Sequence, residues 1–235
     1  MNPKSIVVIP TYNEAANVAS IISKIRKVLP ELYILVIDDG SPDGTANIVD
    51  GITSSDPKVQ CLRRTSKDGI GRAYIAGFTY ALENGFEFIG QMDADHSHSP
   101  SDLVRLLEAS TKSDLVIGSR YVRNGGTVNW PLYRKLLSRL GGIYASSILN
   151  MKINDPTGGF KVWNASLLRQ YDFTGIRSSG YVFTVEMTYR AIGLGAKITE
   201  VPITFTERVA GASKMDGKIM LEAATLVWKL RRPSS

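Results

Sequence analysis

The chain has 235 residues, of which 43% are hydrophobic and 21% charged, a composition typical of a globular protein and not of a disordered one. No run approaches 18 consecutive apolar residues, and the only cysteine, Cys61, excludes an internal disulfide and a cysteine-rich metal site. The net charge of +6 favours an anionic partner, but no zinc-finger spacing, aromatic RNA-binding strand or lysine-rich tail indicates a nucleic acid. The opening residues MNPKSIVVIP contain an apolar run too short for a signal peptide, so we expect no secretion.

Short apolar runs rich in β-branched residues recur along the first half of the chain and predict strands. They lie at residues 5–9, 33–38, 59–63, 86–93 and 114–120. Helical patterns separate them at residues 15–29, 71–85 and 100–110. Strands that alternate with helices favour an α/β fold with a mainly parallel sheet, covered by helices on both faces.

The second half has a different pattern. A basic amphipathic stretch at 130–150 is followed by the turn-rich sequence DPTGGF. A helix near 181–193, a strand at 197–208 and a last helix at about 214–231 follow. No linker rich in proline, glycine or serine separates the two halves, so the sequence predicts one domain over 1–235.

Polar residues follow most of the predicted strands. They occupy residues 10–14, 38–45, 93–95 and 118–121. Because ligands of parallel α/β sheets bind beyond the carboxyl ends of the strands, these residues predict a site for a metal and a phosphate. Asp38 and Asp39 are adjacent and point to opposite sides, so we expect Asp39 to contact a nucleotide and Asp38 to be structural.

Asp93 and Asp95 flank one small residue, so an extended backbone projects both carboxylates to the same side. Hard oxygen ligands of this kind suit Mg²⁺ or Mn²⁺ bridging a diphosphate. The alternative is a zinc site, but His96 and His98 are the only histidines and no third nitrogen or sulfur ligand is available. For both histidines we expect a solvated or helix-capping role.

Known phosphate-binding patterns are incomplete in this sequence. Residues 69–74, GIGRAY, begin like a dinucleotide fingerprint but end in tyrosine, and no GK[ST] sequence exists. Lys67 and Arg72 could still neutralise a phosphate. A second basic group comprises Arg120, Arg134 with Ser138 one helical turn later, Arg208 and Lys214. This group predicts a second phosphate site, with a solvated basic helix face as the alternative.

With these residues in view, the sequence resembles the inverting glycosyltransferases of family 2, and within them the dolichol-phosphate or polyprenol-phosphate mannose synthases. The resemblance covers nearly the whole chain. It rests on PTYNE (10–14), VIDDGSPDGT (36–45), KDGIGRAY (67–74), MDADHSHSP (92–100), GSRY (118–121), WPLYRKLLSR (130–139), DPTGGFK (155–161), GYVFTVEM (180–187) and RVAGASK (208–214).

The resemblance implies a GT-A fold: a Rossmann-like mixed sheet flanked by helices, with C-terminal amphipathic helices. Residues 1–125 would bind the nucleotide sugar and metal, and 126–235 would bind the acceptor and face the membrane. Relatives often have glutamine as a further metal ligand where this chain has Ser97.

The resemblance also assigns roles to individual residues. The guanine and ribose would contact Pro10, Tyr12, Glu14, Ile37 and Asp39. The sugar diphosphate and the metal would be held by Asp93, Ala94 and Asp95, with Ser97 as a weak ligand. The lipid phosphate would be held by Arg120, Arg134 and Ser138, and a loop with Arg208 and Lys214 would close over the donor. Among these, Asp95 and Arg120 are the residues expected to matter most for catalysis.

The implied reaction transfers mannose from GDP-mannose to a dolichyl or polyprenyl monophosphate with inversion. A phosphate monoester is already ionised at neutral pH, so no carboxylate base is needed. The resemblance implies a peripheral protein on the cytosolic face of a membrane. It would be held there by small anchoring subunits or by a continuation of the natural chain. We expect the helix over 132–150 to enter the membrane surface.

Other functions stay open from sequence alone. The nearest is transfer of glucose from UDP-glucose to a polyprenyl phosphate. Another is glycosylation of a saccharide, which needs a catalytic carboxylate late in the chain, for which Asp155 and Glu186 are candidates. For that pair the alternative role is structural support. The last is an inactive scaffold or regulatory subunit that binds a nucleotide sugar, against which the intact Asp93, Asp95 and Arg120 argue.

Overall fold

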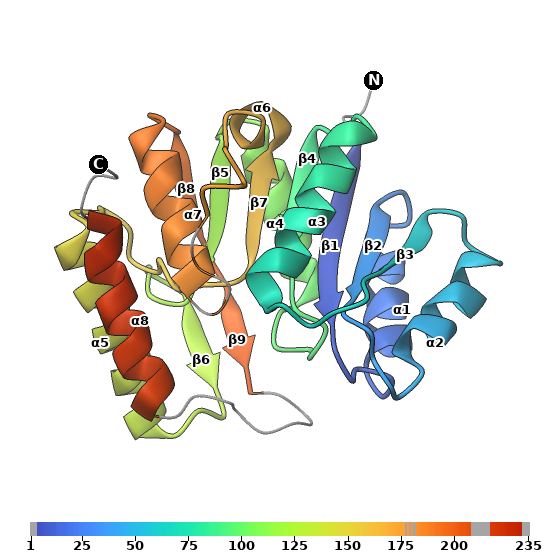
Figure 1. The fold of residues 1–235 in the computed structure, drawn as a ribbon, viewed down its shortest axis with the longest axis horizontal. Helices are drawn as coiled ribbons and strands as arrows, with labels where there is room; N and C mark the ends of the chain where they lie inside the picture. Colours follow the sequence, from blue (N-terminus) through green and yellow to red (C-terminus); the bar gives the residue numbers. More distant parts are fainter. Residues whose placement is uncertain (1–3, 177, 179, 181, 208–216, 232–235) are drawn as a thin grey trace.

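The main sheet has seven strands, shown by a computed structural model that describes all residues except 1–3, 177, 179, 181, 208–216 and 232–235 (Figure 1). The strand order is β3-β2-β1-β4-β7-β5-β8. The strands are β1 (Ser5–Thr11), β2 (Tyr33–Asp38), β3 (Val59–Arg63), β4 (Phe88–Gln91), β5 (Leu115–Ser119), β7 (Lys161–Asn164) and β8 (Ile198–Pro202). The five strands predicted in the first half are confirmed.

Strand β7 was not predicted, and it makes the sheet mixed. It runs antiparallel to both β4 and β5 and separates them. It has only four residues, KVWN, and directly follows the turn-rich segment, so its sequence carries no strand pattern of useful length. Residues of the second half therefore lie within the sheet built by the first half and contribute to the core on each of its faces.

The predicted strand at 197–208 is two strands. After Pro202 the chain leaves the main sheet, and β9 (Thr204–Thr206) pairs in parallel with β6 (Gly126–Val128). Proline lacks an N–H group and cannot continue a ladder of hydrogen bonds. The short β6–β9 ribbon extends beyond the carboxyl ends of the central strands (Figure 1).

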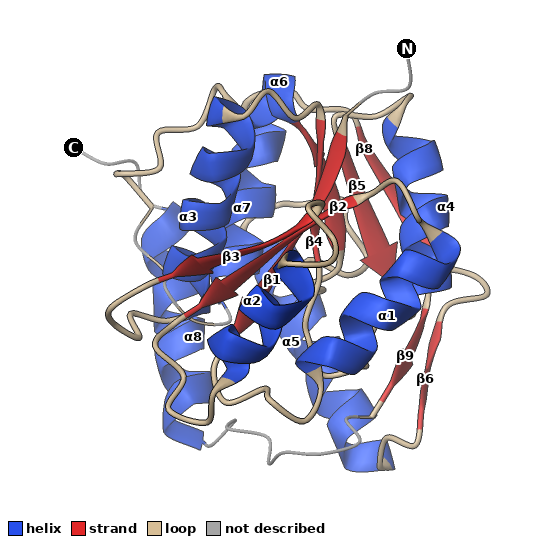
Figure 2. Cartoon of the chain, turned by 90° about the vertical axis from the view of Figure 1, so that its right-hand side faces the viewer, coloured by secondary structure: helices blue, strands red, loops and turns tan. Residues whose placement is uncertain are grey.

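Helices cover both faces of the main sheet (Figure 2). One face carries α1 (Val18–Val28), α2 (Thr45–Thr53) and α4 (Pro100–Ser110). The other carries α3 (Ile70–Glu83), α6 (Ala165–Leu168) and α7 (Val182–Gly193). Alternate residues of β1 divide between the two cores: Ile6 and Val8 pack under α3, and Val7 and Ile9 pack under α1. The predicted two-faced α/β architecture is confirmed.

The C-terminal helices form a third packing unit beside α7. Helix α5 (Leu132–Ile148) and helix α8 (Gly217–Arg231) lie next to each other at the end of the molecule away from β3 (Figure 1). A small core joins α5, α7 and α8 through Ala145, Val185 and Val227. The predicted C-terminal amphipathic helices are thus present.

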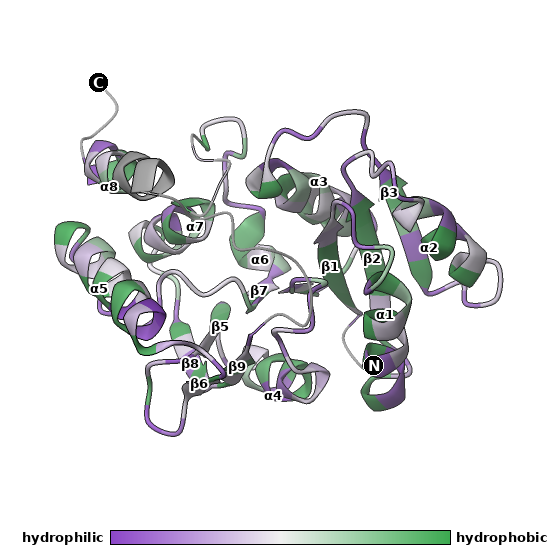
Figure 3. Cartoon of the chain, turned by 90° about the horizontal axis from the view of Figure 1, so that it is seen from below, coloured by the Kyte–Doolittle hydropathy of each residue, from purple (hydrophilic) through white to green (hydrophobic). Residues whose placement is uncertain are grey.

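Helix α5 is unusual because it leaves large apolar side chains exposed. Leu132 is 83% exposed, Leu136 60% and Leu140 53%. Figure 3 views the molecule from the carboxyl edge of the sheet and shows hydrophobic and hydrophilic segments interleaved on α5. Among the described residues, no helix is long and apolar enough to cross a bilayer.

Candidate functional site

The loops after β1 and β2 are tied together at the carboxyl edge of the sheet. Asp38 accepts hydrogen bonds from Thr11 Oγ1 at 3.0 Å and from the backbone N–H of Ser41 at 2.9 Å. The backbone N–H of Glu14 donates to Thr45 Oγ1 at 3.0 Å. Asp38 therefore holds the two loops in place, as expected from the sequence.

Asp39 is buried and forms an ion pair with Arg64, whose Nη1 lies 2.5 Å from Asp39 Oδ1. Burial raises the pKa of the Asp39 carboxyl despite the opposing effect of Arg64. The sequence reasoning missed Arg64. Its position directly after β3, the parallel neighbour of β2, is the signal that could have placed it beside Asp39.

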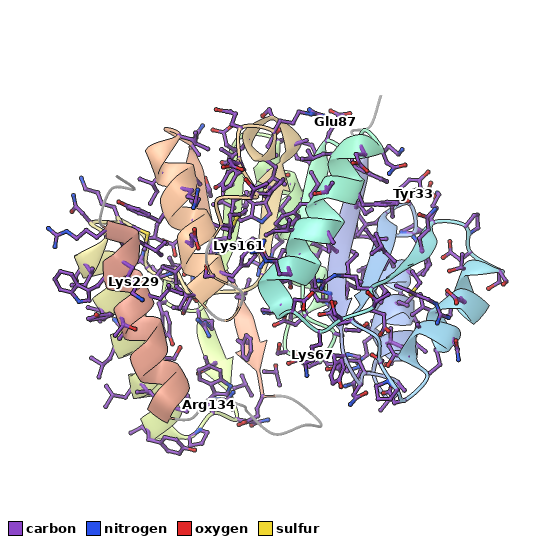
Figure 4. The ribbon with its side chains drawn as sticks, viewed as in Figure 1. Tyr33, Lys67, Glu87, Arg134, Lys161 and Lys229 are labelled. Atoms are coloured by element: carbon purple, nitrogen blue, oxygen red, sulfur yellow. The ribbon has the colours of Figure 1, made fainter. Side chains whose placement is uncertain are left out.

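The other residues expected to contact the nucleotide differ in how accessible they are. Pro10 and Tyr12 lie at the end of β1, and Lys67 Nζ lies 3.5 Å from the centre of the Tyr12 ring. Lys67 and Arg134 both lie in the lower half of the molecule in Figure 4. Ile37, by contrast, has its side chain fully buried in the core under α3.

The acid pair follows β4 directly. Tyr74 Oη donates to Asp93 Oδ1 at 3.2 Å, and the backbone N–H of Asp93 donates to His98 Nδ1 at 3.3 Å. Asp95 is buried and accepts hydrogen bonds from Ser97, at 3.0 Å from its N–H and 2.5 Å from its hydroxyl. The structure therefore brings the two predicted acids and Ser97 into one short loop.

The donor set of this loop fits a hard divalent cation. Two carboxylates and one hydroxyl supply oxygen only, which suits Mg²⁺ or Mn²⁺ completed by diphosphate and water oxygens. The part of the chain that the structure describes contains no group of three or more histidine, cysteine, aspartate and glutamate side chains able to hold a metal by themselves. This loop is therefore better suited to a metal that binds together with a phosphorylated ligand than to a metal held by protein ligands alone.

The prediction of a solvated or capping role is wrong for His98. Its ring is buried, stacks on Phe160 at a centroid distance of 4.7 Å and meets Phe205 edge to face at 5.3 Å. Burial lowers the pKa of His98. His96 is half-buried, with a backbone φ of 63°, and its Nδ1 lies 3.3 Å from Lys24 Nζ.

Arg120 is buried against Asp155 and makes a bidentate ion pair with it. Arg120 Nε lies 2.7 Å from Oδ2 and Nη2 lies 2.6 Å from Oδ1, while the Arg120 N–H also donates to Oδ2 at 2.9 Å. The guanidinium lowers the pKa of the fully buried Asp155 carboxyl despite the cost of burial. Asp155 thus supports Arg120, in agreement with the structural alternative considered for it.

The second candidate carboxylate, Glu186, is also engaged internally. It is fully buried, accepts the N–H of Ser178 at 3.0 Å and pairs with Arg190 at 2.7 Å. Neither late carboxylate is therefore presented to a ligand as a base for a saccharide hydroxyl.

The second basic group gathers around one indole ring. The guanidinium carbon of Arg134 lies 4.5 Å from the centre of the Trp130 ring, and that of Arg120 lies 5.6 Å from it. Arg134 also pairs with Glu207. Ser138 Oγ lies 2.8 Å from Tyr121 Oη. The structure thus brings Arg120 and Arg134 together, with Ser138 reached through Tyr121.

An open groove of about 740 Å³ adjoins these cations. It is lined by Arg120, Tyr121, Gly126, Thr127, Leu132, Tyr133, Lys135, Leu136 and Arg139. Basic side chains and exposed apolar side chains of α5 therefore share one surface. Arg72 is exposed on α3, and the predicted loop cations Arg208 and Lys214 lie outside the described residues.

Solved structures align with this fold over nearly the whole chain. Glucosyl-3-phosphoglycerate synthase from Mycobacterium tuberculosis with UDP aligns with a TM-score of 0.69 at 18% identity, over 100% of this chain and 82% of that one. The same protein with Mn²⁺, UDP and glucosyl-3-phosphoglycerate aligns with a TM-score of 0.67 at 17% identity, over 97% and 78%. The fold is therefore the predicted GT-A fold.

Relatives of known sequence are much more similar. An undecaprenyl-phosphate mannosyltransferase of Micrococcus luteus is 48% identical over 94% of this chain and 91% of its own length. A polyprenol monophosphomannose synthase of Mycolicibacterium smegmatis is 44% identical over 97% and 88%. A dolichol-phosphate mannosyltransferase of Pyrococcus furiosus is 38% identical over 96% and 63%. The sequence model of glycosyl transferase family 2 matches residues 6–172, and the chain belongs to this family.

Proposed function

We propose that this protein transfers mannose from GDP-mannose to a polyprenyl monophosphate, with inversion at the anomeric carbon. The names of the three relatives support mannose transfer to a polyprenyl phosphate. The observation that carries the proposal is the acceptor end of the site. There two arginines meet at Trp130, and the nearby carboxylates of Asp155 and Glu207 are both engaged by arginines.

This arrangement suits a nucleophile that is already charged. A phosphate monoester has a second pKa near 6, so one of its oxygens can attack the anomeric carbon without giving up a proton to the protein. A bond forms between that oxygen and the anomeric carbon, while the bond from this carbon to the diphosphate breaks and its electron pair leaves with GDP. Arg120 and Arg134 would hold the incoming phosphate, with Ser138 as a further donor.

The donor would lie at the carboxyl ends of β1, β2 and β4. The base and ribose would contact Pro10, Tyr12, Glu14, Ile37 and Asp39. Because the side chain of Ile37 is buried in the core, this residue would contact the ligand through its main chain. The loop 93–97 would hold the sugar diphosphate and the Mg²⁺ or Mn²⁺, which lowers the charge of the leaving diphosphate. Residues 1–125 would then serve the donor and 126–235 the acceptor and the membrane.

Transfer can be measured directly with the purified protein and a polyprenyl phosphate. With radiolabelled GDP-mannose and Mg²⁺ or Mn²⁺ we expect a labelled lipid product that EDTA prevents from forming. UDP-glucose, the donor of the nearest alternative, should give at most a trace. No lipid-linked sugar from either donor with either metal would contradict the proposal, and a glucosyl lipid would establish the alternative.

We also propose that α5 lies in the interface of a membrane, on its cytosolic face. Exposed leucines on a helix that also carries Arg134, Lys135 and Arg139 are typical of interfacial helices, which bury an apolar face among lipid head groups. The groove beside α5 would admit the lipid acceptor from the bilayer. Anchoring by small subunits is a further part of this proposal.

Membrane binding should depend on the exposed face of α5. Replacing Leu136, Leu140 and Ile143 together with aspartate puts three charges into that face, so we expect the variant to stay in the supernatant when vesicles containing anionic phospholipid are sedimented. Leu194→Asp is a matched control, because Leu194 is also exposed but follows α7. Equal sedimentation of the triple variant and the unaltered protein would contradict the proposed orientation.

A further inference from the structure

Phe205 lies between the donor and acceptor sites and contacts both. Its ring meets His98 edge to face at 5.3 Å and Trp130 edge to face at 5.2 Å. The guanidinium carbon of Arg120 lies 5.5 Å from the centre of the same ring. One half-buried side chain on β9 thus packs against residues from the loop after β4, the end of β5 and the entry to α5.

On the donor side, these contacts lead directly to the metal-binding loop. His98 accepts the N–H of Asp93 at 3.3 Å and is stacked on the buried Phe160, so its ring is fixed relative to the acid pair. The next residue along β9 adds a backbone link, because the N–H of Thr206 donates to the carbonyl of Ser97 at 3.2 Å. Strand β9 is therefore attached to both ends of the loop that carries Asp95.

On the acceptor side, the contacts lead to the two arginines. Phe205 meets the Trp130 ring edge to face. The guanidinium carbons of Arg134 and Arg120 lie 4.5 Å and 5.6 Å from the centre of that ring. The N–H of Glu207 donates to the carbonyl of Val128 at 3.2 Å, and β9 pairs with β6 just before Trp130. The same three residues of the chain, 205–207, thus reach the acceptor cations as well.

We propose that Phe205 is a positioning residue that sets the separation between the metal-binding loop and the acceptor arginines. This inference rests on the proposed function, in which the phosphate oxygen must approach the anomeric carbon in line with the departing diphosphate. Reacting atoms need to lie about 3–3.5 Å apart, and a displacement of about 1 Å can lower the rate about 100-fold. A rigid aromatic ring that packs against three neighbours fixes such a distance, whereas a leucine leaves gaps.

The kinetic test compares Phe205→Leu with the unaltered protein. We expect kcat for transfer to fall at least about tenfold, with KM for both substrates nearly unchanged, because the binding groups remain but their separation is no longer fixed. Hydrolysis of GDP-mannose by water should rise relative to transfer. Phe173→Leu is the matched control, since Phe173 is a half-buried phenylalanine with two ring neighbours in the core under α3, and it should leave the kinetics unaltered.

A second measurement does not depend on turnover. With 5-fluorotryptophan incorporated and Mn²⁺·GDP bound, we expect the ¹⁹F resonance of Trp130, assigned with Trp130→Phe, to be broadened by the metal. Phe205→Leu should change this broadening but leave that of Trp163 unaltered. If Phe205→Leu changes the broadening but the unaltered protein makes no mannosyl lipid, the positioning role is retained and the proposed function is rejected. Unaltered kcat together with unaltered broadening would overturn the positioning role.

Discussion

Replacing Asp95 with alanine is expected to abolish transfer, with kcat lowered at least about 1,000-fold, a loss of about 4 kcal/mol of transition-state stabilisation. Asp95 is buried in the loop after β4 and accepts a hydrogen bond from the Ser97 hydroxyl, so its removal takes away the proposed principal metal ligand and the support of the proposed weaker one. Transfer from GDP-mannose at saturating Mn²⁺ measures the effect. Binding of Mn²⁺·GDP, followed by calorimetry, should weaken in parallel.

The matched control is His96→Ala, because His96 is the next residue but is half-buried and contacts Lys24 on α1. This variant should keep most of the activity. Thermal unfolding of both variants shows whether a loss of activity results from a loss of the folded state. If both variants lose activity equally while remaining folded, the assignment of the metal ligands to oxygen donors is wrong.

The second large effect is expected at Arg120. Arg120→Met leaves Asp155 buried without its partner, which should lower the free energy of unfolding by about 3–5 kcal/mol, because an unpaired buried charge is costly. Transfer should fall about 100- to 1,000-fold, since the cation proposed for the acceptor phosphate is lost as well. Denaturant unfolding and transfer kinetics measure the two losses separately.

A double variant separates these two roles. Arg120→Met with Asp155→Asn removes both charges, so most of the lost stability should return while transfer remains low. Recovery of transfer together with stability would show that Arg120 acts only by supporting the fold.

The cost of Arg120→Met should depend on pH with a definite sign. The pKa of Asp155 is lowered in the folded protein, so the stabilisation from the pair is fully present above the ordinary carboxyl pKa of about 4. It is lost as the pH falls through the lower folded-state value. The difference in unfolding free energy between the unaltered protein and Arg120→Met should therefore shrink below about pH 4. A difference that is independent of pH in this range would contradict the ion-pair explanation.

Local patterns predicted most of the fold, because the recognised strands are short segments rich in apolar residues, most of them bounded by turn residues. Strand β7 was not predicted because it begins with a charged residue, Lys161, whose position is fully buried. Lys161 is accommodated there by donating to the carbonyl of Thr184 at 2.8 Å and to Thr188 Oγ1 at 2.6 Å, and burial lowers its pKa to about 7. Figure 4 shows Lys161 in the interior between the helices and the sheet. No short sequence pattern contains these partners.

The candidate site, too, was predicted only in part from sequence. The acids and arginines could be named from sequence because they follow strands at a common edge. Their immediate partners were harder to name. Arg64 needed only the pairing of β2 with β3, but Asp155 reaches Arg120 across 35 residues, and the rings around His98 come from still more distant parts of the chain. Asp155 precedes β7, the strand missing from the prediction, and Phe205 lies on β9 outside the main sheet, so neither position could be placed from the predicted strands.

The ion pair between Arg134 and Glu207 has a consequence for which anions the acceptor site accepts. Arg134 donates to Glu207 through Nη1, so an anion that binds the other N–H groups of the guanidinium lies beside a carboxylate whose charge opposes it. A phosphate monoester can offset this repulsion because its oxygens accept paired hydrogen bonds from a guanidinium, whereas chloride cannot accept such a pair. We expect the neighbouring carboxylate to weaken the binding of abundant small anions at the proposed acceptor site, while the lipid phosphate, delivered at high local concentration by a membrane, still enters.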